Sequence, residues 1–255
     1  PTMGQRLSRA KAKIAAARIP YAIPGPEDWD ERLKSVLAVI YLIYNAGYTP
    51  DPGSARDLCA EAIFLTRLLD HLRPGEPEIE GALALLLLTQ SRARARIGAD
   101  GASVPLHRQD RALWDGAARA EGLGLIDRAM ARRAPGPYQI KAAIAACHGR
   151  DDGADWPQIA ALYTRLLDYE PTPVVRLNRA VARAEAGDLP AALAEVEALA
   201  DMLEDYQPFH AARADLLRRT GQNEAARAAY ERAIALAGSL ADAAFLTIQR
   251  DKVLN

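Results

Sequence analysis

Apolar residues recur with the period of an α-helix along most of the chain. The pattern predicts one helix over residues 29–48, apolar around most of its girth, a second over residues 54–72 and a third over about residues 77–96. Half of the residues are apolar, and few runs of β-branched residues interrupt the spacing. Because Ala, Leu and Arg dominate and favour helices, the fold class is predicted to be all-α.

The second half of the chain repeats itself with the period of a known helical repeat. Residues 172–205 align with residues 206–239 without a gap, so that Gly187 corresponds to Gly221. A small residue in a first helix, a turn glycine and alanines in a second helix are typical of the tetratricopeptide (TPR) repeat. Since one such hairpin cannot bury its apolar face alone, neighbouring hairpins must stack. We therefore expect a right-handed TPR-like α-solenoid of antiparallel helix hairpins with a C-terminal capping helix.

One stretch is predicted to be non-helical. Asp100-Gly101 has the composition of a tight turn, and short extended pieces are expected on either side of it. The sequence therefore predicts a short β-hairpin near residues 97–107.

Charge is distributed unevenly along the 255 residues. The first 18 residues carry five Lys or Arg and no acid, which leaves −6 for the rest of a chain whose net charge is −1. A basic segment on an acidic body indicates an anionic partner for that segment alone.

The longest apolar run, residues 82–88, is too short to span a bilayer, and Cys59 and Cys147 are isolated. These features predict a cytoplasmic protein with reduced thiols and no membrane partner.

The basic segment is predicted to form one amphipathic helix over residues 1–14. Its apolar positions fall on one face, and the other faces carry side chains that suit base edges and phosphates: Thr2, Gln5, Arg6, Ser8, Arg9 and Lys13. A solvated basic helix end is the alternative interpretation of the same residues.

Residues 1–14, PTMGQRLSRAKAKI, resemble the last helix of region 4 in extracytoplasmic-function (ECF) sigma factors, the helix that reads the −35 promoter element. Residues 36–48, 136–140, 174–182 and 210–219 resemble the group of these factors that has a TPR-type C-terminal extension. The resemblance implies that the intact protein directs RNA polymerase to promoters. It also implies that the six polar residues of the first helix contact DNA, and that the extension tunes this activity.

The chain departs from the family in two respects. Where the family often has Asn-Glu-Gly-Tyr, this sequence has Asn45-Ala46-Gly47-Tyr48, and sigma region 2 and the first helices of region 4 are absent. Because the first residue is Pro1 rather than Met, we expect the chain to be part of a longer protein. The expected organisation is the end of region 4 (1–18), a Pro-containing linker (19–28), a helical subdomain (29–134) and TPR-like repeats with a capping helix (135–255).

An inner groove is the expected partner-binding surface of such an array. Asn and Arg in a groove commonly hold a peptide backbone or a carboxylate. The candidate groove residues are Asn45, Tyr48, Gln109, Asp110, Arg111, Trp114, Tyr138, Gln139, Asn178, Arg179, His210 and Arg213. The alternative is structural: Arg179 and Arg213 could pair with nearby acids such as Glu185 and Asp215, and Asp110 could cap a helix.

No catalytic constellation is evident in the sequence. The four histidines are scattered without an i, i+4 pair, and no glycine-rich phosphate loop follows a predicted strand. We therefore expect no enzymatic activity, no cofactor and no metal. The expected partners are RNA polymerase core and promoter DNA, through the missing sigma regions, and a protein or peptide in the groove.

Two other functions fit the same residues. A stand-alone TPR adaptor would have the basic helix only incidentally, and a small-molecule sensor would use a pocket near residues 109–114. The coding sequence immediately before Pro1 distinguishes the sigma factor from the adaptor, and ligand-dependent thermal shifts test the sensor.

Three arginines lie at the end of the third predicted helix: Arg92, Arg94 and Arg96. They are either solvated or contact an acidic partner or nucleic acid.

Overall fold

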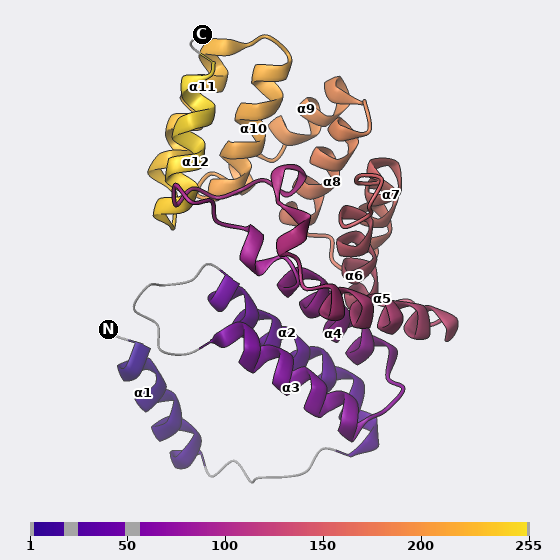
Figure 1. Cartoon of the computed structure of the whole chain (residues 1–255). Coiled ribbons are helices and arrows are strands. Elements are labelled where there is room, and N and C mark those ends of the chain that lie inside the picture. Colours follow the sequence, from indigo (N-terminus) through magenta and orange to yellow (C-terminus); the bar gives the residue numbers. More distant parts are fainter. Residues whose placement is uncertain (1–2, 18–24, 49–56, 254–255) are drawn as a thin grey trace. The chain divides into compact units, whose positions relative to one another are not determined.

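The computed structural model describes residues 3–17, 25–48 and 57–253 (Figure 1). Three predictions fall outside these ranges. They concern Thr2 as a DNA-contacting residue, Ser54 as the start of the second helix, and residues 19–24 of the expected linker. Across the ranges described, the regular secondary structure consists of twelve α-helices and five short 3-10 helices. The prediction of an all-α fold is therefore confirmed.

The chain forms two compact units, Pro1–Val39 and Ile40–Asn255, here called unit 1 and unit 2. Unit 1 contains α1 (Met3–Ala16), the 3-10 turn η1 (Pro26–Asp28) and the first part of α2 (Trp29–Tyr48). Unit 2 contains the rest of α2 and the remaining elements: α3 (Leu58–Leu72), α4 (Pro77–Gln90), η2 (Ala93–Ala95), η3 (Leu106–Arg108), η4 (Arg111–Leu113), α5 (Gly116–Ala131), α6 (Pro137–His148), α7 (Trp156–Leu166), α8 (Pro173–Glu185), α9 (Leu189–Glu197), η5 (Ala200–Met202), α10 (Gln207–Arg219), α11 (Asn223–Ala235) and α12 (Leu240–Asp251).

Helix α4 is the central element of the first part of unit 2. Every residue from Ile79 to Leu88 is buried, and α3, α5 and α6 all pack on this helix. Two glycines allow the close approach. A Cβ at Gly81 would lie 2.7 Å from the backbone nitrogen of Gln139 in α6, and one at Gly122 in α5 would lie 2.9 Å from Cγ of Leu88. A helix that is apolar on all sides is stable only when it is enclosed in this way.

In the second part of unit 2, each helix from α6 to α12 packs on the next one along the chain. The two segments related by the sequence repeat form the pairs α8–α9 and α10–α11 (Figure 1). Ala180 and Ala214, which correspond in the alignment, are both completely buried, so the helix backbones approach closely. The turns contain Gly187 (φ 106°) and Gly221 (φ 78°), and residues with a side chain rarely adopt such positive φ angles.

The predicted hairpin near residues 97–107 is present only as a single antiparallel bridge between Ile97 and Ser103. Gly101, with φ 78°, forms the turn and donates its N–H to the carbonyl of Gly98 at 3.0 Å. The same segment contacts the last helix of the chain. Ser103 Oγ donates to Asp242 Oδ1 of α12 at 2.7 Å, and its backbone N–H donates to the carbonyl of Ala241 at 3.2 Å. These contacts tie the 97–105 segment to the C-terminal end of the helical array.

Two predicted helix boundaries are wrong. The third helix ends at Gln90 instead of Arg96, because Ser91 Oγ donates back to the carbonyl of Leu88 at 2.8 Å and Arg96 folds over the end of the helix. The second helix begins at Leu58, where the carboxylate of Asp57 accepts the N–H of Ala60 at 2.9 Å and acts as the N-cap. Within the described ranges, no helix combines the length and apolarity that crossing a bilayer requires.

Candidate functional site

Arginine and aromatic side chains cluster where α2 and α4 end. The Arg96 guanidinium lies 4.0 Å from the ring centroid of Tyr48 and donates to the Tyr48 carbonyl at 3.3 Å. It also donates to the Tyr44 hydroxyl at 3.3 Å, and that hydroxyl donates to Gln90 Oε1 at 3.2 Å. Burial raises the pKa of Tyr44, so this hydroxyl remains protonated and able to donate. Arg96 therefore holds the end of α2 against the end of α4.

The indole of Trp114 extends this cluster towards α5 and α6. The guanidinium carbons of Arg111 and Arg92 lie 4.9 Å and 6.0 Å from its ring centroid. Arg111 also reaches the C-terminal end of α6, where it donates to the carbonyl of Arg150 at 2.6 Å and pairs with Asp151 at 3.1 Å. The indole N–H of Trp114 is buried and has no acceptor in the part of the chain that the structure describes.

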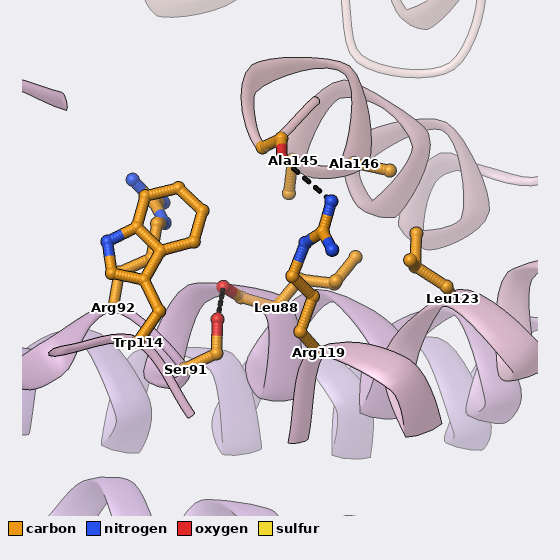
Figure 2. Close-up of a pocket in the computed structure, with 9 residues that line it drawn as sticks. Leu88, Ser91, Arg92, Trp114, Arg119, Leu123, Ala145 and Ala146 are labelled. Carbon is orange, nitrogen blue, oxygen red and sulfur yellow. Dashed lines mark hydrogen bonds between the residues drawn. The ribbon is translucent and has the colours of Figure 1, made fainter. Parts of the chain in front are cut away.

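A pocket lies beside Trp114, between α4, α5 and the end of α6 (Figure 2). About 230 Å³ of empty space lies within it, part of which is open to solvent. The lining residues are Leu88, Ser91, Arg92, Trp114, Arg119, Leu123, Ala145, Ala146 and Gly149. Arg119 extends towards α6, donating to the carbonyl of Gly149 at 3.0 Å and pairing with Asp151 at 3.2 Å. The pocket therefore combines an apolar wall with two guanidinium groups.

His148, in the last turn of α6, is close to this pocket. Burial lowers the pKa of its imidazole to about 4, and the positive charge of Arg92 contributes to this shift. The ring lies edge-on to Trp156, with 5.1 Å between the centroids, and the buried Nδ1 atom has no hydrogen-bond partner among the described residues. His148 is therefore neutral near pH 7.

A second cluster, of tyrosines, surrounds Lys141 of α6. The Lys141 ammonium lies 5.3 Å from the ring centroid of Tyr41 and 5.0 Å from that of Tyr138, and it pairs with Glu170 at 2.7 Å. Burial raises the pKa of Tyr41, a hydrogen bond with Asn45 opposes the rise, and the charge of Glu170 adds to it. Tyr206, the residue before α10, also raises the pKa of Tyr41. Four segments of the chain therefore bring these side chains together: α2, α6, the connection between α7 and α8, and the residue before α10.

Some of the predicted groove residues have local structural roles. Gln109 donates through Nε2 to the carbonyl of Val104 at 3.1 Å, and the Asp110 carboxylate accepts the N–H of Ala112 at 2.9 Å and so caps η4. Gln139 is buried, and its amide donates to the Glu78 carboxylate at 3.0 Å. Gln139 is therefore part of the packing between α4 and α6 and is not on an open surface.

The predicted groove residues of the repeats are spread over α8 and α10. Arg179 pairs with Glu195 at 2.5 Å and Arg213 with Glu197 at 2.9 Å. Structural pairing of these arginines is confirmed, but the partners are not the predicted Glu185 and Asp215, both of which pair with Arg219. His210 hydrogen-bonds the carbonyl of Glu204 at 2.8 Å through Nε2, and Asn178 is exposed.

The predicted DNA-contacting residues lie on α1. The side chains of Gln5, Ser8, Arg9 and Lys13 are exposed, and Arg9 Nε donates to the carbonyl of Gln5 at 3.4 Å. Arg6 lies within α1, whereas Thr2 is outside the described residues. The helix contains no acidic residue.

Two residues of the clusters were not predicted from sequence. Arg119 lines the pocket and Tyr41 belongs to the tyrosine cluster, yet each looks like an ordinary position of an amphipathic helix. The alternation of arginines after α4 is a weak signal for Arg92. No periodic signal brings Tyr41 next to Lys141, because a hundred residues of intervening fold determine that contact.

Residues 32–130 match the family described as "Family of unknown function (DUF6596)". The match includes Tyr48, Arg92, Arg96 and Trp114, and it ends before α6. The chain is also similar to the uncharacterized protein R00370 of Rhizobium meliloti (strain 1021), with 49% identity over 255 residues that cover 98% of this chain and 60% of that protein. The chain thus spans about three fifths of the length of this relative. No solved structure matches it.

Within the described ranges, no three His, Cys, Asp or Glu side chains lie close enough together to hold a metal ion. Cys59 and Cys147 are free thiols, and burial raises the pKa of both. Burial therefore keeps these two thiols in the protonated, less nucleophilic form.

Proposed function

We propose that this chain is the C-terminal regulatory part of an ECF sigma factor that directs RNA polymerase to promoters in the cytoplasm. The observation that carries the proposal is α1, whose described side chains present Gln5, Ser8, Arg9, Lys11 and Lys13 to solvent with no acid in the helix. Amides and hydroxyls can contact base edges, and cations can contact phosphates. The similarity to a longer protein, of which this chain covers 60%, leaves room for the remaining sigma regions.

Helices α6 to α12 act in this proposal as a TPR-like right-handed solenoid. Supporting it are the equivalent turn glycines Gly187 and Gly221, the equivalent buried alanines Ala180 and Ala214, and the packing of each helix on the next. Arrays of this kind bind partners on an extended surface.

The tyrosine cluster around Lys141 is the proposed contact surface for a protein partner. Tyr41 and Lys141 are half-buried, whereas Asn45 and Tyr206 are exposed, so part of the cluster is accessible. Tyrosine is enriched at protein interfaces because a large apolar ring and a hydroxyl are held by only two side-chain torsions. In the intact factor, this surface would contact the sigma regions or the polymerase and so tune initiation.

The proposal is tested with the longer protein that contains this chain. The purified protein is mixed with core RNA polymerase and assayed by run-off transcription on a promoter library. We expect it to bind the core enzyme and to initiate from a distinct set of promoters. A protein that neither binds the core enzyme nor supports initiation would contradict the proposal.

Charge variants test the role of α1 directly. Arg9→Ala combined with Lys13→Ala should weaken promoter binding and reduce the slope of log affinity against log salt by about two, one for each lost phosphate contact. The matched control is Arg94→Ala combined with Lys252→Ala, which removes the same charge from exposed positions outside α1. If the two double variants lose promoter affinity equally, the loss reflects positive charge in general, and α1 is not the helix that contacts promoter DNA.

Two exposed residues test the proposed contact surface. Asn45→Ala combined with Tyr206→Ala should reduce transcription at least several-fold, while the lost hydrogen bond to Tyr41 should lower the free energy of unfolding by no more than about 1.5 kcal/mol. The control is Asn178→Ala, which removes an exposed amide from α8. Unchanged transcription in the double variant would rule out this surface.

Small-molecule sensing is a second candidate function, favoured by the pocket between α4, α5 and α6. Its two guanidinium groups, beside leucine and alanine side chains, can hold the charged group of a small anion.

A further inference from the structure

Arg92 is a half-buried arginine with no carboxylate partner among the residues that the structure describes. Within the described part of unit 2, the half-buried arginines Arg119, Arg179, Arg183, Arg213, Arg219 and Arg250 each have a carboxylate within 4 Å. No described carboxylate lies within that distance of Arg92, Arg96 or Arg176. Arg96 compensates with three acceptors, whereas Arg92 has only the indole face of Trp114.

This arrangement is electrostatically unfavourable in the absence of a ligand. Burial lowers the pKa of Arg92, and the neighbouring charge of Arg96 lowers it further. A desolvated cation without a counter-ion destabilises a fold, which is why buried charges are normally paired. An anion placed beside Arg92 would relieve the penalty.

The surroundings of Arg92 suit such an anion. Figure 2 shows the guanidinium of Arg92 behind the indole of Trp114, while Arg119 extends towards the end of α6. Two buried nitrogens near this point, Nε1 of Trp114 and Nδ1 of His148, lack partners among the described residues. Asp151, the carboxylate that Arg111 and Arg119 share, is 83% exposed, so solvent screens it strongly. Positive charge therefore dominates at the pocket.

We propose that the pocket lined by Arg92, Trp114 and Arg119 binds a small organic anion through its carboxylate or phosphate group. The guanidinium of Arg92 offers two parallel N–H donors that match two oxygens of such a group. Leu88, Leu123, Ala145 and Ala146 line the pocket beside the two guanidinium groups. Because part of the empty space of about 230 Å³ is open to solvent, the pocket holds only the charged group of such a ligand.

This site rests on the second candidate function, small-molecule sensing, and gives it a ligand class, whereas it does not depend on the sigma-factor proposal. It supplies a chemical input to unit 2 whether the chain acts on a polymerase or on another protein. Since α4, α5 and α6 all contribute to the wall, an occupied pocket stiffens the central packing of unit 2.

Binding is measured on the 255-residue chain by calorimetry, at constant ionic strength set with chloride. The probes are inorganic phosphate and the unbranched monocarboxylates from acetate to valerate. If the ligand is a carboxylate, acetate should bind more tightly than inorganic phosphate, and the longer monocarboxylates should bind about as well as acetate because their methylenes remain in solvent. If the ligand is a phosphate, inorganic phosphate should bind more tightly than acetate. No saturable binding of any probe below about 50 mM would overturn the proposal.

Paired variants locate the site. Arg92→Met keeps an unbranched side chain against Trp114 but removes the guanidinium group, and should weaken binding at least tenfold. Arg92→Lys keeps the charge without the planar fork and should give an intermediate loss. Arg94→Met is the matched control, since Arg94 is exposed and belongs to the same short segment. Equal losses in Arg92→Met and Arg94→Met would place the anion elsewhere.

Stability separates a ligand-binding arginine from a structural one. Because Arg92 is desolvated and unpaired, Arg92→Met should leave the melting temperature of the ligand-free chain unchanged or raise it relative to Arg94→Met. A lower melting temperature in Arg92→Met, together with unchanged anion binding, would show that Arg92 serves packing and would overturn the proposal.

The ring of His148 gives an independent readout by NMR. An anion beside Arg92 offsets the charge that contributes to the low pKa of His148, so saturating probe should raise that pKa. The ring signals of His71, which is exposed on α3, serve as the control. An identical His148 titration with and without saturating probe would contradict binding next to Arg92.

Discussion

The guanidinium of Arg96 stacks on the ring of Tyr48, 4.0 Å from its centroid, and joins two segments that are 48 residues apart. The same group donates to the carbonyl of Thr89 and to the hydroxyl of Tyr44. Arg96 thus satisfies acceptors at the ends of two helices at once. Its neighbour Arg92, one turn earlier, has none of these contacts. Two arginines of one segment therefore differ in role, one holding the fold and the other facing the pocket.

Arg96→Lys should lower the free energy of unfolding by about 1–3 kcal/mol, because an ammonium cannot stack on Tyr48 and also reach three acceptors. Urea denaturation of the 255-residue chain measures the change. Arg94→Lys, at an exposed position, should change it by no more than about 0.5 kcal/mol. Equal values for the two variants would show that the Arg96 contacts contribute nothing to stability.

The stability of the chain should depend on pH through His148. Its pKa is about 4 in the folded protein against an ordinary value of 6.5. Below pH 6.5 the unfolded chain binds a proton that the folded chain excludes, so stability falls as the pH decreases from 6.5 towards 4 and this contribution levels off below 4. The loss is on the order of 3 kcal/mol in total.

The pH contribution of His148 is isolated by comparing the wild-type chain with His148→Gln in urea titrations between pH 4 and 7. The variant cannot titrate at this position, so its stability should fall less over the same range. Parallel curves for the two proteins would mean that His148 is as easily protonated in the folded chain as in the unfolded one.

Gly81→Ala should destabilise the chain by about 1–3 kcal/mol. A Cβ at this position would lie 2.7 Å from the backbone nitrogen of Gln139, and α6 would have to move away from α4. Gly124→Ala is the matched control, because its Cβ would meet nothing closer than 3.9 Å within α5. Helix propensity alone should make this control neutral or more stable by up to about 1 kcal/mol. Thermal unfolding of both variants checks the prediction, which fails if they shift in the same direction.

Glu78→Gln should weaken the start of α6. The Glu78 carboxylate accepts the N–H of Tyr138 at 3.0 Å and that of Gln139 at 3.3 Å, so a negative charge lies at a helix N-terminus. Replacing it with an amide should cost about 1–2 kcal/mol in unfolding free energy. Glu76→Gln, at the N-cap position of α4 and without a side-chain capping bond, should have a smaller effect. Denaturant unfolding of the two variants distinguishes them, and a larger loss in Glu76→Gln would refute the capping role.

The sequence predicted helices better than it predicted their ends. Periodicity identified the helices correctly because each buries one face or all faces, and the repeat placed turns at Gly187 and Gly221, both of which have positive φ. The end of α4 was missed because the residues after Gln90 still have helical spacing. A side chain from outside the helix, Tyr44, contributes to that ending through Arg96.

The candidate site was predicted only in part. Trp114 and Arg111 were recognised as an unusual local group, and they do lie together. The pairing of Arg179 with Glu195 could not be derived, because it depends on how α8 and α9 face each other. Gln139 was expected on an open surface, but Gly81 lets α4 approach so closely that the amide is enclosed. Sequence spacing identifies one face of a helix, whereas the neighbouring helix decides whether that face remains accessible.

The complete enclosure of α4 has a consequence for synthesis on the ribosome. From Ile79 to Leu88 the helix has a single polar side chain, Glu80, and two of the helices that cover it, α5 and α6, follow it in the chain. A nascent chain that ends before residue 148 would leave these mostly apolar residues covered only in part, a ready target for chaperones or aggregation. Fragments for biochemical work should therefore extend beyond α6.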